Sequence, residues 1–142
     1  MWQRQKKQLG LISAGADVIY QWLDNASMAV IETAKEKNVY AFGNTKDQLK
    51  IAPDTILTSA VKRMDLAIAK LAELAKQKQL KGKEYSFGLE KSDILSLGEF
   101  GTKVPHDVVQ KAWDIQEDIV TKKIVFEKCQ EAGVATRCIK KA

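Results

Sequence analysis

Polar, charged and aromatic residues follow three short apolar stretches of the 142-residue chain, and these side chains are the ones best suited to chemistry. The stretches are ADVIY (16–20), VYAF (39–42) and TILTS (55–59), and the residues of interest that follow them are Trp22, Asp24, Asn25, Thr45, Asp47 and Lys62. A carboxylate or an ammonium group shielded from water gains about 1.5–3 kcal/mol from each hydrogen bond with a hydroxyl group. An indole ring can stack on a flat ring of a ligand. This set of side chains predicts a binding site for a small polar ligand.

Catalysis would require a nucleophile with its base, or a metal cluster. His106 is the only histidine, and it lies beside Pro105 with no serine or cysteine motif nearby. The chain contains neither GxGxxG nor GxxxxGK[ST], so no nucleotide-phosphate cradle is indicated. Cys129 and Cys138 do not have the spacing of a zinc site, and they either form a disulfide or remain free thiols. We expect a protein with no catalytic activity, no metal and no cofactor.

The three apolar stretches are predicted strands, and helices alternate with them. Residues 26–37 form a helix between the first two strands, with Ala26, Ala29, Val30, Thr33 and Ala34 on one face. A strand, a helix and a strand in so short a segment are typical of a βαβ unit and predict an α/β fold with a parallel sheet. Ligands of open α/β sheets bind beyond the carboxyl ends of the strands, so the polar residues are expected to converge there.

Simpler interpretations of the same residues remain open. Asp24 or Asn25 is suited to cap the helix 26–37, and Trp22 can pack at the rim of the sheet. Asp47 can be a turn residue, and Lys62 can be a solvated lysine in the first turn of a helix over 61–79. That helix has an apolar face that includes Met64, Ile68, Leu71 and Ala75.

Other elements complete the predicted domain. A helix over 3–14 ends at Gly15, short strands cover 84–89 and 94–97, and Pro105 begins a helix over 106–121. The 45% hydrophobic content is sufficient for the core of one domain. The net charge of +5 is spread over lysines that alternate with acids, which argues against nucleic-acid binding. No apolar run is long enough to span a bilayer, and the first residues lack the pattern of a signal peptide.

Five segments together resemble the basic membrane protein family, in the family's order and spacing across Leu9 to Ile124. They are GADVIY (15–20), ETAKEKNVYAFG (32–43), APDTILTSAVKRMD (52–65), YSFGL (85–89) and GEFGTKVPHDV (98–108). Members of this family are substrate-binding lipoproteins of ABC importers, and many bind purine nucleosides. The resemblance implies a type I periplasmic-binding-protein-like fold with two hinged α/β lobes, of which this chain matches only the C-terminal half. Residues 1–60 and 84–125 are then expected mainly in one lobe, and residues 61–80 in a helix that crosses to the other.

The resemblance also implies roles for single residues. Lys62 matches the family's ligand lysine, which contacts a sugar hydroxyl. The family segment GVDSDQ lies over Gly43 to Gln48, so Thr45 stands where an acidic residue holds the ribose, and Asp47 keeps the second acid. Residues 24–27 replace the family's glycine-rich turn and leave less room for a backbone contact with the ligand.

The expected function is therefore solute binding for an ABC importer, with a nucleoside-like ligand, in truncated form. The alternatives are a regulatory or interaction protein of the same family, similar to transcriptional regulators of competence, and a fragment without function. The expected partners are a small-molecule ligand, an ABC permease and a second copy of the chain paired through exposed strand edges. The resemblance places the protein at the extracytoplasmic face of the cell membrane, whereas a chain complete as given would be cytoplasmic.

Overall fold

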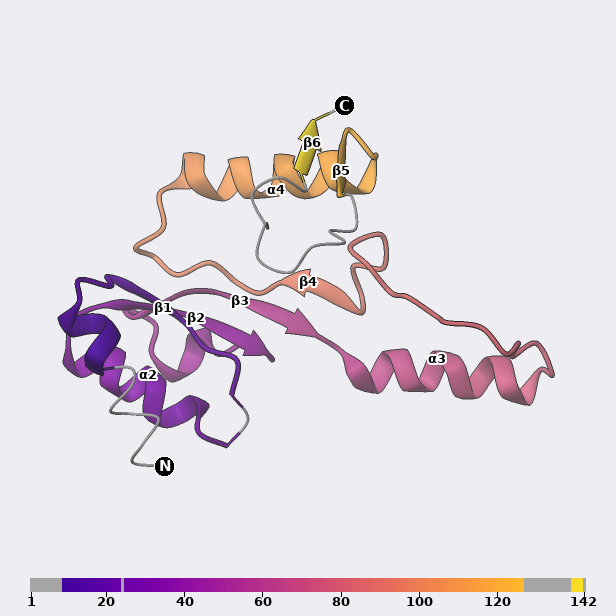
Figure 1. Ribbon diagram of the computed structural model, residues 1–142, viewed down its shortest axis with the longest axis horizontal. Coiled ribbons are helices and arrows are strands. Elements are labelled where there is room, and N and C mark those ends of the chain that lie inside the picture. The colour runs from indigo at the N-terminus through magenta and orange to yellow at the C-terminus, as the bar shows by residue number, and fades with distance from the viewer. Residues whose placement is uncertain (1–8, 24, 127–138, 142) are drawn as a thin grey trace. The chain divides into compact units, whose positions relative to one another are not determined.

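The computed structural model describes residues 9–23, 25–126 and 139–141, within two compact units that consist of residues 1–104 and 105–142 (Figure 1). The first unit contains a sheet with strand order β1-β2-β3-β4. The strands are β1 (Val18–Tyr20), β2 (Tyr40–Thr45), β3 (Ile56–Lys62) and β4 (Leu95–Leu97). β1, β2 and β3 are parallel, and β4 is antiparallel to β3. The predicted α/β fold with a mainly parallel sheet is confirmed.

The core lies between the sheet and helix α2 (Ser27–Glu36), which covers one of its faces (Figure 1). Ile31 and Ala34 of α2 pack with Ala41 of β2 and Ile56 of β3, and all four are at most 1% exposed. The predicted face of this helix includes Val30, Thr33 and Ala34, which are buried as expected. Ile31 was missed because it lies one position beyond that stripe.

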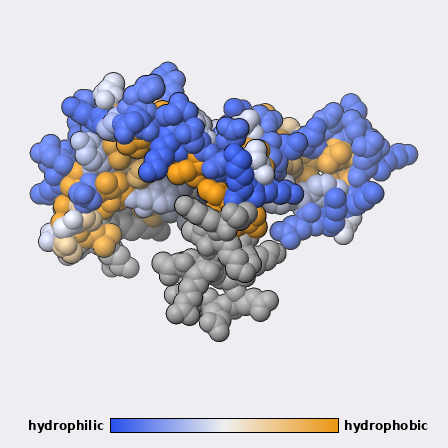
Figure 2. Space-filling model, turned by 90° about the horizontal axis from the view of Figure 1, so that it is seen from above, coloured by the Kyte–Doolittle hydropathy of each residue, from blue (hydrophilic) through white to orange (hydrophobic). Residues whose placement is uncertain are grey.

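The opposite face of the sheet carries apolar side chains that remain in contact with solvent. Val18, Tyr20 and Tyr40 are 37%, 57% and 39% exposed, and the strand register places them on the face away from Ala41. Figure 2 shows the general pattern on the side that it presents, where hydrophobic patches interrupt a mostly hydrophilic surface.

Strands β2 and β3 extend further than their apolar runs predict. Gly43 pairs with Ser59 and Thr45 with Val61, so β2 continues to Thr45 and β3 to Lys62. The placement of Lys62 in the first turn of a helix was therefore wrong, because the strand continues through it. Helix α3 (Met64–Lys76) begins two residues later.

Helix α3 does not bury its predicted apolar face within the first unit. Met64 and Ile68 are 58% and 63% exposed, and Ala67 is the buried residue of this helix. The prediction of a strand over 84–89 was also wrong, since residues 84–88 adopt no regular structure. In this segment the Tyr85 hydroxyl accepts a hydrogen bond from the backbone N–H of Lys81 at 2.9 Å.

The second unit begins with helix α4 (His106–Val120), directly after Pro105, as predicted. It continues into β5 (Ile124–Phe126), which pairs antiparallel with β6 (Ile139–Lys141), a pairing that the sequence pattern did not indicate. Cys129 and Cys138 lie outside the described residues. Among the residues that are described, no helix combines the length and the apolar character needed to cross a membrane.

Gly15 ends the first helical segment, residues 9–13, in a left-handed conformation with φ of +98°. The N–H of Gly15 bonds to the carbonyl of Ile12, and the N–H of Ala16 bonds to the carbonyl of Leu11. These two bonds form a Schellman cap, in which a residue with a Cβ is strained.

We expect Gly15→Ala to lower the free energy of unfolding by about 1 kcal/mol, because an L-residue in this conformation costs about 1–2 kcal/mol. Gly10→Ala is the matched control, since a Cβ there meets no atom within 4 Å and Gly10 lies in helical residues. Urea denaturation of both variants measures the difference. Equal stabilities of the two variants would show that the cap does not constrain this end of the helix.

Candidate functional site

The carboxyl ends of three parallel strands form one edge of the sheet (Figure 1). Trp22 lies two residues beyond β1, Thr45 is the last residue of β2, and Lys62 is the last residue of β3. Three of the residues proposed from the sequence thus follow or end neighbouring strands. This is the part of an open α/β sheet where ligands bind.

Lys62 and Trp22 are in contact, although they come from strands on either side of β2. The Lys62 Nζ lies 5.0 Å from the centroid of the Trp22 ring, within the range of a cation–π interaction. Trp22 is nevertheless 80% exposed, so most of its indole surface is accessible to another molecule. A cation and an exposed aromatic ring therefore lie together at this edge.

A hollow of about 600 Å³ opens at the same edge. Its lining consists of Thr45, Lys46, Asp47, Val61, Lys62, Arg63, Met64 and Asp65. Thr45 has a positive φ of 71°, which ends the extended conformation of β2 and turns the chain toward Asp47. The structure thus brings Thr45, Asp47 and Lys62 to one hollow, with Trp22 in contact with Lys62.

Asp47 holds three separate segments together. Its Oδ1 accepts hydrogen bonds from the N–H of Leu49 and from the hydroxyl of Ser59, each at 3.1 Å, and its Oδ2 accepts one from the N–H of Glu99 at 2.9 Å. Burial raises the pKa of Asp47, but these three hydrogen bonds and the charge of Lys50 outweigh it, so the pKa lies below its ordinary value. The carboxylate already has protein partners, and its contact with a ligand stays a prediction.

A second network of polar side chains stabilises the same edge and was missed from the sequence. Gln48 Oε1 accepts hydrogen bonds from Gln21 Nε2 and from the backbone N–H of Asn44, both at 3.0 Å. The N–H of Gln48 donates to the Ser59 hydroxyl, also at 3.0 Å. Gln21, Asn44 and Ser59 are at most 4% exposed. Their places in the sequence could have identified two of these residues, because Gln21 directly follows β1 and Gln48 lies in the polar run after β2.

Arg63 and Asp65 form an ion pair on the wall of the hollow, with Nη2 and Oδ2 2.7 Å apart. The hydrogen bonds from Arg63 lower the pKa of Asp65 to about 2. Both side chains are exposed, so water screens this pair. Asp65 therefore stays ionised at neutral pH and adds to the lining of the hollow a carboxylate that the sequence did not suggest.

The turn that precedes α2 differs from the prediction. Ala26 occupies the N-cap position and makes no side-chain hydrogen bond to the helix, so the assignment of Asn25 as a cap was wrong. Asn25 is exposed, and Asp24 lies outside the described residues. Neither residue is among those that line the hollow at the carboxyl edge.

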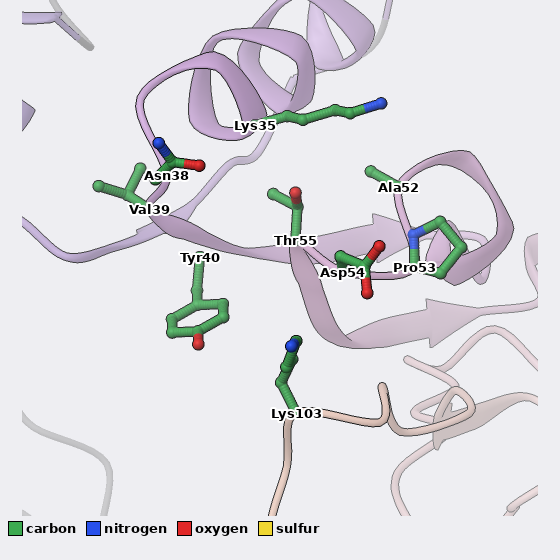
Figure 3. Close-up of a pocket in the computed structure, with 9 residues that line it drawn as sticks. All are labelled: Lys35, Asn38, Val39, Tyr40, Ala52, Pro53, Asp54, Thr55 and Lys103. Atoms are coloured by element: carbon green, nitrogen blue, oxygen red, sulfur yellow. The ribbon is translucent and has the colours of Figure 1, made fainter.

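Another hollow, of about 450 Å³, lies at the opposite end of the strands (Figure 3). It is lined by Lys35, Asn38, Val39, Tyr40, Ala52, Pro53, Asp54, Thr55 and Lys103. Lys35 and Lys103 approach it from opposite sides (Figure 3). This hollow adjoins the amino ends of β2 and β3, whereas ligands of open parallel sheets bind at the carboxyl ends. The carboxyl edge is therefore the stronger candidate.

Comparisons with known proteins identify a family and several relatives. Residues 4–130 match the model of the family described as ABC transporter substrate-binding protein PnrA-like. The Purine-binding protein of Brucella abortus (strain 2308) is 31% identical over 109 residues, which are 77% of this chain and 30% of that protein. The Transcriptional activator protein med of Bacillus subtilis (strain 168) is 32% identical over 97 residues, which are 68% of this chain and 30% of that protein.

Solved structures support the same fold. A transcriptional activator of the comK gene from Bacillus halodurans superposes with a TM-score of 0.74 and 26% identity, over 81% of this chain and 40% of that one. A solute-binding protein of an ABC transporter system from Aeropyrum pernix K1 superposes with a TM-score of 0.75 and 16% identity, over 90% of this chain and 45% of that one. The chain spans about a third of the length of the curated relatives that it matches.

The match of the family model over most of the chain agrees with the α/β sheet and with the segments that resemble the basic membrane protein family. The chain belongs to the family of PnrA-like ABC transporter substrate-binding proteins.

Proposed function

We propose that this chain supplies one side of the ligand site of a solute-binding protein that delivers a nucleoside-like compound to an ABC importer. The observation that carries the proposal is the contact between Lys62 and Trp22 beside the hollow at the carboxyl edge. The Lys62 ammonium group can donate hydrogen bonds to sugar hydroxyls, and the indole can stack on a base. The purine-binding relative supports a ligand of this class.

The contact also limits how a base can stack. Lys62 Nζ already lies over one face of the Trp22 ring, so a base either uses the other face or displaces the ammonium group. Because Trp22 is 80% exposed, the first arrangement is sterically open. The ammonium group then polarises the ring from one side while the base stacks on the other.

Thr45 changes the expected strength of binding. Its hydroxyl donates or accepts one neutral hydrogen bond where the family resemblance implies a carboxylate. Hydrogen bonds to charged groups are worth about 1.5–3 kcal/mol, and those between neutral groups about 0.5–1.5 kcal/mol. We therefore propose weaker retention of the ribose hydroxyls than in relatives with an acid at this position.

We expect adenosine, guanosine or inosine to bind this chain weakly, at about millimolar concentrations, since we propose that it supplies only one side of the ligand site. Titration followed by amide chemical shifts in NMR should move the signals of residues 45–47 and 61–65. Lys62→Ala should weaken binding about tenfold, because it removes the hydrogen-bonding cation and its contact with Trp22. Lys103→Ala is the matched control, since this lysine lines the hollow at the other end of the sheet.

The control also locates the site. Larger shifts around Lys35 and Lys103 than around Lys62, or loss of binding in Lys103→Ala alone, would place the ligand at the amino ends of the strands. No shift with any of the three nucleosides at about 10 mM would contradict the nucleoside assignment.

A regulatory role is the second candidate, and two relatives that are transcriptional activators favour it. Deleting the gene and measuring both the uptake of labelled guanosine and transcript levels separates the two roles. Reduced uptake with unchanged transcripts supports import. Changed transcripts with normal uptake support a regulatory member of the family.

The proposal for import includes a permease as partner and, from the family resemblance, a position at the extracytoplasmic face of the membrane. It also includes pairing of two copies through the edge strand β1, whose Tyr20 is 57% exposed. Light scattering at increasing concentration tests the pairing, and a mass that stays that of one chain contradicts it.

A further inference from the structure

Asn44 is a buried polar residue at the carboxyl edge that the hydrogen bonds of the protein leave unsatisfied. The residue is 4% exposed. Its backbone N–H donates to Gln48, but neither the nitrogen nor the oxygen of its side-chain amide has a hydrogen-bond partner among the described residues. Buried amides are almost always paired, because burial without a partner is unfavourable. An unpaired amide at a ligand-binding edge therefore requires an explanation.

The strand register places this amide next to the candidate site. Asn44 pairs with Ala60 of β3, and paired residues of parallel strands direct their side chains to the same face. Lys62, two residues beyond Ala60, lies on that face as well. Because β2 lies between β1 and β3, the contact between Lys62 and Trp22 spans the end of β2, where Asn44 is located.

The two groups that span this position are suited to move. Trp22 is 80% exposed and follows the end of β1, and its contact with Lys62 is a cation–π interaction at an exposed site. Such contacts are weak, so a ligand that stacks on the indole or binds the ammonium group can shift the pair. When the ammonium group leaves the indole, the amide of Asn44 becomes accessible from the face of the sheet that carries Lys62.

We propose that Asn44 is a specificity-determining residue of this edge, whose amide pairs with a neighbouring donor and acceptor on the ligand, as on the edge of a purine or pyrimidine base. A side-chain amide presents an acceptor oxygen beside a donor NH₂ group, and it forms two hydrogen bonds with a base edge such as that of adenine. This inference rests on the proposed ligand-binding function of the edge. It adds that a residue of strand β2 forms hydrogen bonds with the base of the ligand, and not only with the sugar.

Substituting Asn44 tests the inference in the unliganded protein. Asn44→Val removes an unpaired buried amide and introduces a side chain suited to a strand, so the thermal midpoint should stay the same or rise. A midpoint lowered by several degrees would show that the amide has an internal partner, and it would overturn the inference.

Ligand probes test it directly. Free adenine, free uracil and ribose are titrated into the wild-type chain while the side-chain NH₂ signals of Asn44 are followed by NMR. We expect both bases to shift these signals and ribose to leave them unchanged. Asn44→Val should weaken the binding of either base at least tenfold, and Lys103→Ala should leave it unaltered.

The outcomes separate this inference from the proposed function. If nucleosides bind at Lys62 with equal affinity in the wild type and in Asn44→Val, the inference is wrong and the proposed function stands. If adenine shifts Asn44 but no nucleoside binds, the inference stands and the nucleoside assignment fails. If neither base shifts the Asn44 signals, the inference is overturned.

Discussion

Gly43→Ala should lower the free energy of unfolding by about 3 kcal/mol, at the upper end of the usual range for overpacking a buried site. A Cβ at this position would lie 2.3 Å from Ser59 Oγ, 2.9 Å from Ser59 Cβ and 3.1 Å from Gln48 Cβ. Gly43 and Ser59 are paired across β2 and β3, so the backbones cannot separate without breaking the ladder that ends at Thr45. Urea denaturation measures the loss.

The nearest atoms belong to one side chain, so the effect has a specific rescue. In the double variant Gly43→Ala, Ser59→Gly, the two closest atoms are absent, and most of the loss caused by Gly43→Ala should disappear relative to Ser59→Gly alone. Gly82→Ala is the control for a glycine with open surroundings, and its stability should change by at most about 0.5 kcal/mol. A loss in Gly43→Ala that persists in the double variant would show that the cause is not contact with Ser59.

Asp47→Ala should lower the free energy of unfolding by about 2 kcal/mol. The carboxylate accepts hydrogen bonds from Leu49, Ser59 and Glu99, and its removal leaves the buried hydroxyl of Ser59 without this acceptor. Hydrogen bonds to a charged group contribute about 1.5–3 kcal/mol each when buried, and solvent around Asp47 reduces their sum. Asp54→Ala, at an exposed carboxylate in the other hollow, should have little effect.

The same hydrogen bonds give Asp47 a pH dependence with a defined sign. Its folded-state pKa is lowered, so the folded state binds a proton less readily than the unfolded state. The stabilisation is therefore fully present above the unfolded pKa of about 3.9 and is lost as the pH falls through the lower folded-state pKa. The stability difference between the wild type and Asp47→Ala should shrink between about pH 5 and pH 2. A difference that stays constant over that range would contradict the role of the carboxylate.

The sequence predicts those parts of the fold that depend on local patterns. The β-branched residues of β1, the apolar stripe of α2 and Pro105 before α4 each identify their element without reference to the rest of the chain. Gly15 was correctly identified as a helix end, because only a glycine accepts a φ of +98° without strain.

The remaining features depend on partners that are distant in the sequence. Gly43 and Asn44 have low intrinsic preference for strands, and they belong to β2 because Ser59 and Ala60 pair with them. Residues 84–88 contain aromatic residues typical of a strand, but they have no strand to pair with among the described residues.

The candidate site likewise combines features that the local sequence predicts with contacts between distant residues that it does not predict. The parallel strands allow the sequence to place Trp22 and Lys62 at one edge, but not to predict their contact across β2. The hydrogen bond from Glu99 to Asp47 joins residues 52 positions apart and has no local signature. The cap of helix α2 was predicted wrongly at Asn25, because the N-cap is Ala26, which makes no side-chain hydrogen bond to the first turn.

The bonding of Asp47 has a consequence for how this chain can evolve. A Cβ on Gly98 would lie 2.7 Å from the Asp47 carboxylate carbon, and the neighbouring Glu99 donates its N–H to the same carboxylate. A side chain at position 98 therefore requires the Asp47 carboxylate to move from its hydrogen bonds or residue 47 to be replaced. The effect of a substitution at position 47 therefore depends on the residue at position 98. Changes in the loop that follows Thr45 are in this way linked to a residue that is distant in the sequence.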